Sequence, residues 1–112
     1  MENRLSYVIR FVANMNETVR FYRDVMGLTL IFQSPHWSEF ATGETKLALH
    51  LASATNSPGK VQIGLRVPNL QAFYETMIAQ GLTFTQTPIV ESGSKLARFL
   101  DVEGIECSVS EG

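Results

Sequence analysis

Few side chains of this chain are candidates for an acid, base, nucleophile or metal ligand, and no nucleophile stands in a recognised catalytic motif. His50 lies in the strand-like segment Leu47–Leu51, and an imidazole that is neutral near pH 7 can carry a proton or accept a hydrogen bond. Ser108 lacks the Gly-x-Ser-x-Gly context of a hydrolase nucleophile. A lone histidine on a strand is more often structural than catalytic, so both interpretations of His50 stay open at this point.

Strand alternation groups these residues with others of mixed chemistry. Successive side chains of a strand point to opposite faces. Strand by strand, single faces carry Tyr7, Ile9 and Phe11; Ala48 and His50; Gln62, Gly64 and Arg66; and Glu106 and Ser108. These faces are mostly apolar and aromatic with a few polar groups, the composition that a small-molecule pocket requires.

Several neighbours of this set admit more than one interpretation. Arg66 and Glu106 could orient an ionic substrate as a pair, or form a structural salt bridge or solvated rim charges. Trp37, at the turn before the third strand, could stack on a flat ligand or cover the core or an interface. Cys107 alternates away from this face and is interpreted as a packing residue. Arg10 falls where an apolar, helix-facing residue is expected, and the pattern does not explain it.

The secondary-structure pattern that carries these residues occurs twice in the chain. A strand-like segment ends at Val12, an amphipathic stretch follows, and Gly27 stands 15 positions after Val12. The same order returns in the second half, where Gly81 stands 14 positions after Val67. A duplicated strand–helix–strand unit predicts a site at the seam between the two halves.

The individual elements follow from turn residues and hydrophobic periodicity. We predict strands at Leu5–Val12, Leu28–Ser34, Trp37–Thr42, Lys46–Ala52, Lys60–Val67, Phe84–Gln86, Leu96–Leu100 and Ile105–Ser110. Two amphipathic stretches predict helices, the first capped by Asn14 or Asn16 and the second over residues 70–78. The helix aromatics expected in the core are Phe21, Tyr22, Phe73 and Tyr74.

Each half therefore consists of one strand, one helix and three further strands. This order predicts an α+β fold in which two βαβββ modules form a curved mixed sheet around a cleft, with the helices on the convex side. We expect a single domain over residues 1–112, made of modules 1–53 and 60–112 joined by the linker 54–59.

Composition places the chain among ordinary globular proteins. It has 112 residues, 45% of them apolar and 18% charged, with a formal charge of −2, which suits one domain with a modest core. No basic stripe is visible, so we expect no nucleic-acid partner. No apolar run approaches the ~20 residues of a membrane span, so no membrane partner is expected either. The chain start lacks the apolar region of a signal peptide, and the single Cys107 excludes an intramolecular disulfide, so we predict a cytoplasmic protein.

Three segments give the chain a family resemblance. The resemblance begins with Val12-Ala13-Asn14-Met15 and continues over Phe21-Tyr22-Arg23-Asp24-Val25-Met26-Gly27-Leu28. Together these are similar to the first module of the vicinal oxygen chelate superfamily, which includes glyoxalase I, bleomycin-resistance proteins, fosfomycin-modifying enzymes and extradiol dioxygenases. A segment of the second half resembles the second-module signature of this superfamily, F-x-D-P-x-G. This segment is Phe99-Leu100-Asp101-Val102-Glu103-Gly104, with Val102 in the proline position. The resemblance spans the chain and implies the fold, but this fold hosts many unrelated activities.

The resemblance also implies four candidate metal-ligand positions, two in each module. They fall at Tyr7, His50, Gln62 and Ser108, where metal-dependent members carry His, Glu or sometimes Gln. Only His50 is a strong ligand for a divalent ion, because a neutral phenol and a hydroxyl bind metals poorly. We therefore expect no metal cofactor. If a divalent metal does bind, we expect its ligands to be His50, Gln62 and Glu106.

The leading hypothesis is a metal-independent glyoxalase/bleomycin-resistance-like protein that binds a small organic molecule in the concave cleft. The cleft would be lined by Tyr7, Ile9, Phe11, Trp37, Ala48, His50, Gln62, Arg66, Glu106 and Ser108. The alternative is an isomerase, lyase or dioxygenase-like enzyme for a small oxygenated substrate, with His50 as metal ligand or acid–base group and Tyr7 and Glu106 as further catalytic candidates. A third hypothesis is a regulatory or structural protein with a vestigial pocket. The resemblance further implies a homodimer in which each cleft combines the first module of one chain with the second module of the other.

Overall fold

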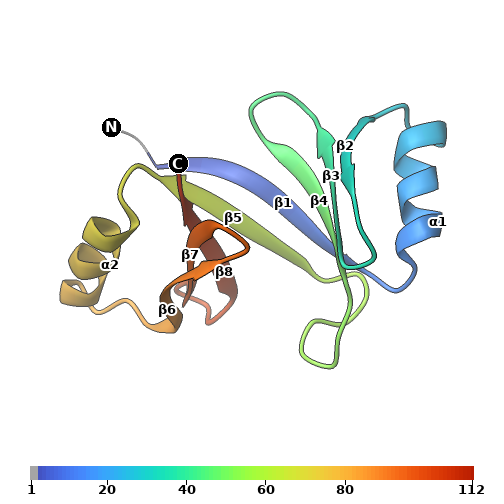
Figure 1. Ribbon diagram of the computed structural model, residues 1–112. Helices are drawn as coiled ribbons and strands as arrows, with labels where there is room; N and C mark the ends of the chain where they lie inside the picture. Colours follow the sequence, from blue (N-terminus) through green and yellow to red (C-terminus); the bar gives the residue numbers. More distant parts are fainter. Residues whose placement is uncertain (1–2) are drawn as a thin grey trace. The chain divides into compact units, whose positions relative to one another are not determined.

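The computed structural model describes residues 3–112 (Figure 1). In chain order the elements are β1 Arg4–Val12, α1 Met15–Arg20, the π-helical turn η1 Phe21–Val25, β2 Thr29–Gln33, β3 Trp37–Ala41, β4 Lys46–Leu51, β5 Val61–Val67, α2 Leu70–Ala79, β6 Phe84–Glu91, β7 Ser94–Leu100 and β8 Glu106–Glu111. This order confirms the α+β class, and in it one strand, one helix and three strands follow one another twice. The chain divides into two compact units, which we call the N-terminal unit, Ser6–Gln62, and the C-terminal unit, Ile63–Gly112 with the start of β1.

In the N-terminal unit, the sheet has the strand order β2-β3-β4-β1, with β1 parallel to β4 and the other pairs antiparallel. Asn14 caps α1, because its side-chain oxygen accepts a 3.0 Å hydrogen bond from the amide of Glu17. Gly27 ends the helical segment with φ +75°, a conformation that a side chain would strain. The core between α1 and the sheet contains Val12, Met15, Val19, Phe40 and Leu49.

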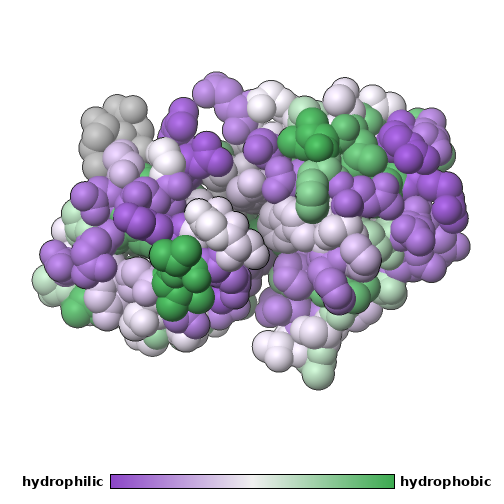
Figure 2. All heavy atoms as spheres, in the orientation of Figure 1, coloured by the Kyte–Doolittle hydropathy of each residue, from purple (hydrophilic) through white to green (hydrophobic). Residues whose placement is uncertain are grey.

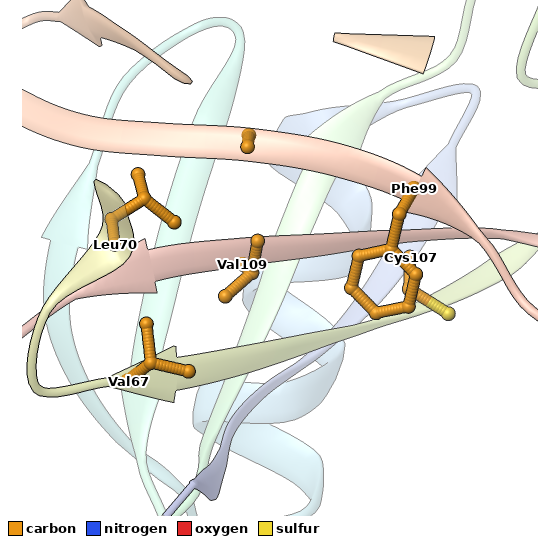
Figure 3. Close-up of a cluster of buried hydrophobic side chains, with 6 residues drawn as sticks. Val67, Leu70, Phe99, Cys107 and Val109 are labelled. Atoms are coloured by element: carbon orange, nitrogen blue, oxygen red, sulfur yellow. The ribbon is translucent and has the colours of Figure 1, made fainter. Parts of the chain in front are cut away.

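The C-terminal unit repeats this plan with the order β5-β8-β7-β6 and with β5 parallel to β8. Asn69 caps α2 through a 2.9 Å hydrogen bond from the amide of Ala72. Figure 3 shows the core, to which β5, α2, β7 and β8 all contribute. Its buried members are Val67, Leu70, Ala97, Phe99, Cys107 and Val109. Cys107 is therefore a packing residue, as alternation predicted, and burial raises the pKa of its thiol.

Two details differ from the sequence-based expectations. β6 continues to Glu91 through Pro88, whereas we predicted only a short strand at its start. Proline is tolerated there because β6 is the last strand of the sheet and the ladder is already broken between Gln86 and Ile89. Phe21 is 47% exposed rather than buried, because it follows the buried Val19 by two positions and so lies about 200° further around the helix, on its far side.

The N-terminal unit leaves a group of apolar side chains exposed next to its edge strand. We call Phe21, Val25, Met26, Ile31 and Phe32 the apolar edge; their exposed fractions range from 47% to 71%. In Figure 2, hydrophobic atoms gather over the part of the surface near β2 and β3. Within residues 3–112, neither helix has the length and apolar composition needed to cross a membrane.

Candidate functional site

One face of the N-terminal sheet, opposite the α1 core, carries the candidates from the first half of the chain. Ile9 lies beside Ala48, and Phe11 lies beside His50, because β1 and β4 are parallel and in register. Trp37 of β3 lies on the other side of His50. The candidates that the structure brings together here are Tyr7, Ile9, Phe11, Trp37, Ala48 and His50. We call this surface the aromatic face.

A carboxylate that the sequence analysis did not single out organises the aromatic face. Oε2 of Glu39 accepts hydrogen bonds from Nε1 of Trp37 at 2.7 Å and from the hydroxyl of Tyr7 at 3.2 Å. Its other oxygen lies 3.5 Å from Nζ of Lys46, whose ammonium also stands 5.7 Å from the centre of the Tyr7 ring. Glu39 follows Trp37 by two positions, so alternation along β3 was the signal that could have identified it.

His50 stands in this face with one ring nitrogen already engaged. Its Nδ1 lies 2.8 Å from the carbonyl oxygen of Leu51. A carbonyl only accepts, so Nδ1 carries a proton and Nε2 of the neutral ring is the nitrogen that can accept one. The ring centre is 5.0 Å from that of Phe11 and 5.9 Å from that of Trp37, the latter edge-on at 89°. The face thus combines the half-buried rings of Tyr7 and Trp37 with one directional acceptor, while Phe11 is buried beneath them in the core.

The remaining candidates lie on β5 and β8. Gln62 is 5% exposed. Arg66 pairs with Ser110, two positions beyond Ser108, so these three residues share one face of the C-terminal sheet. Glu106 lies on the same face four positions from Ser110, which is about 13 Å along a strand. Arg66 and Glu106 therefore do not form the salt bridge that we considered for them.

The donor groups at the candidate ligand positions do not fit a divalent metal ion. Tyr7 donates its proton to the carboxylate of Glu39 and is therefore a neutral phenol, which is a poor ligand. The amide and the hydroxyl at two other positions are also uncharged, which leaves His50 as the single strong donor. Glu106, considered as a substitute, accepts a 2.6 Å hydrogen bond from Thr85. Within residues 3–112, no three His, Cys, Asp or Glu side chains are grouped so that they could hold a metal ion.

Comparisons with known proteins agree on the family and the fold. A family model described as Glyoxalase/Bleomycin resistance protein/Dioxygenase superfamily matches residues 4–109. No curated protein matches the chain. A hypothetical protein from Bacillus halodurans C-125 is similar in structure, with a TM-score of 0.85 and 16% identity over 100% of this chain and 96% of that chain.

Two further solved structures are similar despite low identity. Methylmalonyl-CoA epimerase from Mycobacterium tuberculosis has a TM-score of 0.82 and 19% identity, covering 96% of this chain and 87% of that chain. An NAD-dependent benzaldehyde dehydrogenase structure from Legionella pneumophila has a TM-score of 0.77 and 15% identity, covering 98% of each chain. At these identities the likeness shows the fold alone.

Proposed function

Because the chain belongs to the Glyoxalase/Bleomycin resistance protein/Dioxygenase superfamily, we propose that it binds a small planar organic molecule on the aromatic face, without a metal. The observation that carries this proposal is the shared carboxylate of Glu39, which holds Trp37 and Tyr7 beside His50. Aromatic rings stack favourably on flat ligands and bury a large area. A ring that is already held in place loses little conformational entropy when the ligand arrives.

The metal-independent part of the proposal is supported by the donor chemistry at the four candidate positions. A single imidazole with uncharged partners does not offset the charge of a divalent ion. His50 serves instead through Nε2, which accepts a hydrogen bond from a donor group of the ligand. The cytoplasmic location remains part of the same proposal and is supported by the unpaired, buried Cys107.

A second candidate function is an isomerase or lyase of the same superfamily. The observation that favours it is the engaged Nδ1 of His50, because this leaves Nε2 free to take a proton from a substrate carbon or hydroxyl. Similar structures include a methylmalonyl-CoA epimerase, so epimerisation of a small acyl substrate is the first activity to assay. Turnover that is unchanged in His50→Ala would exclude this role.

The test of binding uses Trp37, because it is the single tryptophan of the chain and lies in the aromatic face. Neutral bicyclic aromatic compounds such as quinoline and indazole are titrated into tag-free protein with EDTA present, and tryptophan fluorescence and Tm are recorded. We expect saturable quenching and a raised Tm, because a ligand of the folded state stabilises it. His50→Ala should weaken binding by about tenfold, the loss of one good hydrogen bond.

The matched control is His36→Ala, since His36 is the other histidine of the chain and is exposed in the turn before β3. The His36→Ala variant should bind the aromatic compounds with the same affinity as the unmodified protein. Absence of saturable binding across the panel would overturn the binding proposal. One divalent ion per chain by elemental mass spectrometry, lost in His50→Ala, would overturn metal independence.

A further inference from the structure

We propose that the C-terminal unit binds a small anion, a carboxylate or a phosphate group, at Arg66. The Nε atom of Arg66 is buried and has no hydrogen-bond partner within residues 3–112. Buried polar donors in native proteins are nearly always satisfied, and an unsatisfied one is costly. The Nε–H group of Arg66 is shielded from water and forms no hydrogen bond with the described protein atoms. We therefore expect the guanidinium to bind a partner from outside the chain.

The neighbours of Arg66 supply the rest of an anion site. Arg66 lies beside Ser110 on β8, and Arg98 of β7 lies beside Ser108. The four side chains share the face of the sheet opposite the α2 core, because the buried Val109 alternates with the two serines. All four are half-buried. Two guanidinium groups and two hydroxyls on one face match the acceptor oxygens of a carboxylate or a phosphate.

The two arginines also extend toward the same end of this face. A side chain built on Gly112 would approach Cδ of Arg66 to 2.8 Å and Nε to 3.0 Å, so Arg66 extends along β8 past Ser110. Nη2 of Arg98 lies 3.9 Å from Glu91, which pairs with the first residue of β7, at that same end. This ion pair is long, and the Glu91 side chain is 56% exposed, so it competes weakly with an incoming anion.

A second arginine of the chain provides an internal contrast. Nε of Arg10 is likewise buried without a partner within residues 3–112. Arg10, however, lies beside the fully buried Leu49 on the side of the sheet that faces the α1 core. Its partner on β4 is apolar, and the next hydroxyl in that register, that of Ser38 on β3, already donates to Sδ of Met15, so an anion would lose its hydration there without compensation. Because of its polar neighbours, Arg66 rather than Arg10 is the candidate anion site.

The proposal goes beyond the aromatic-face function and is tested with different probes. Inorganic phosphate and acetate are titrated into the full chain, with chloride at equal ionic strength as the reference, and ¹H–¹⁵N spectra are recorded. We expect saturable shifts of the Arg66 Nε–Hε signal and of the Ser108 and Ser110 amides. Whichever anion binds more tightly identifies the class of group. Equal shifts in chloride, with no saturation by either probe, would overturn the proposal.

Variants separate an anion site from a general effect of charge. Arg66→Gln should lower the affinity by at least about tenfold, as expected for a lost charge-assisted bond, whereas Arg66→Lys should retain part of it. The control is Arg23→Gln, which removes the same charge from an exposed ion pair in the other unit. If Arg66→Gln does not fold, Ser110→Ala gives the test, with a measurable loss of affinity expected. Unchanged anion affinity in a folded Arg66→Gln or Ser110→Ala variant would contradict the anion site. This outcome does not depend on whether the aromatic compounds bind to the aromatic face.

Discussion

At the scale of single residues, the feature that matters most is a carboxylate with three partners. Glu39 accepts from Trp37 and Tyr7 and lies close to Lys46. Hydrogen bonds to a charged group are stronger than neutral ones, and a half-buried carboxylate needs them because it has lost part of its hydration. The aromatic face is therefore held by one side chain rather than by packing alone.

This arrangement predicts coupling between Tyr7 and Glu39. Tyr7→Phe should lower the free energy of unfolding by about 1 kcal/mol, the usual worth of one such bond. In the Glu39→Gln background the same substitution should cost measurably less, because the charged acceptor is gone. Urea denaturation of the four proteins of this double-mutant cycle measures the coupling.

A second tyrosine gives the control for this cycle. Tyr22 packs against the α1 core, where its ring centre lies 6.0 Å from that of Phe40. Tyr22→Phe should show no coupling with Glu39→Gln, since the two side chains belong to opposite faces of the sheet. Equal coupling for Tyr7 and Tyr22 would mean that the hydrogen bond from Tyr7 to Glu39 contributes nothing.

At the scale of elements, an asparagine caps the helix of each half, but within residues 3–112 only α2 receives an additional capping hydrogen bond. Asn14 and Asn69 cap α1 and α2 with side-chain oxygens. In α2, a carboxylate oxygen of Glu111 accepts an additional 3.0 Å hydrogen bond from the amide of Leu70. This bond satisfies a second free amide of the first turn and places a negative charge near the positive end of the helix dipole.

The second cap predicts a pH dependence of stability. The backbone hydrogen bond from Leu70 lowers the pKa of Glu111 below its ordinary value of 4.5, and Lys95 acts in the same direction. A lowered folded-state pKa stabilises the fold at pH above the ordinary value, and this contribution is lost as pH falls through the folded pKa. Glu111→Gln should therefore lose less stability than the unmodified protein between about pH 5 and about pH 3.

Tm measured across this pH range tests the prediction. Glu75→Gln is the matched control, because Glu75 lies on the same helix, is exposed and bonds only a side chain, Gln71. It should leave the pH profile unchanged. If Glu111→Gln and the unmodified protein lose stability in parallel on acidification, the carboxylate of Glu111 is not the group responsible.

At the scale of the whole molecule, we propose that the chain pairs with a second copy of itself through the apolar edge. The apolar edge adjoins β2, which is the last strand of its sheet, and unprotected edge strands readily pair. A two-fold axis sets identical edge strands antiparallel, so one surface can serve both partners. The dimers implied by the family resemblance support a second copy as the occupant.

The pairing is tested by adding a charge to the apolar edge. Phe32→Glu, on β2, should shift the protein from dimer to monomer in sedimentation equilibrium at micromolar concentration, because the charge would be buried without a partner. Val102→Glu is the control, since Val102 is fully exposed in a turn. A strictly monomeric unmodified protein, or a Phe32→Glu variant that remains dimeric, would contradict the proposal.

Much of this structure could be predicted from the amino-acid sequence. The repeated elements, the caps at Asn14 and Asn69, the left-handed Gly27 and the burial of Cys107 were predictable, because each depends on residues adjacent along the chain or on strand alternation. Membership of the family was also visible in short motifs. The prediction failed for Phe21, which lies on the far side of the helix from the buried Val19, and at Pro88, which the edge strand β6 tolerates.

Which side chains act together depends on contacts between strands that are distant in the sequence. Glu39 became part of the candidate site because the ladder β1-β4-β3 brings Tyr7 and Trp37 within reach of one carboxylate. Arg66 differs from Arg10 because of its neighbours on β8, not because of its own strand. Register between strands distant in sequence depends on the whole packed sheet, so no pattern along one strand could reveal these contacts.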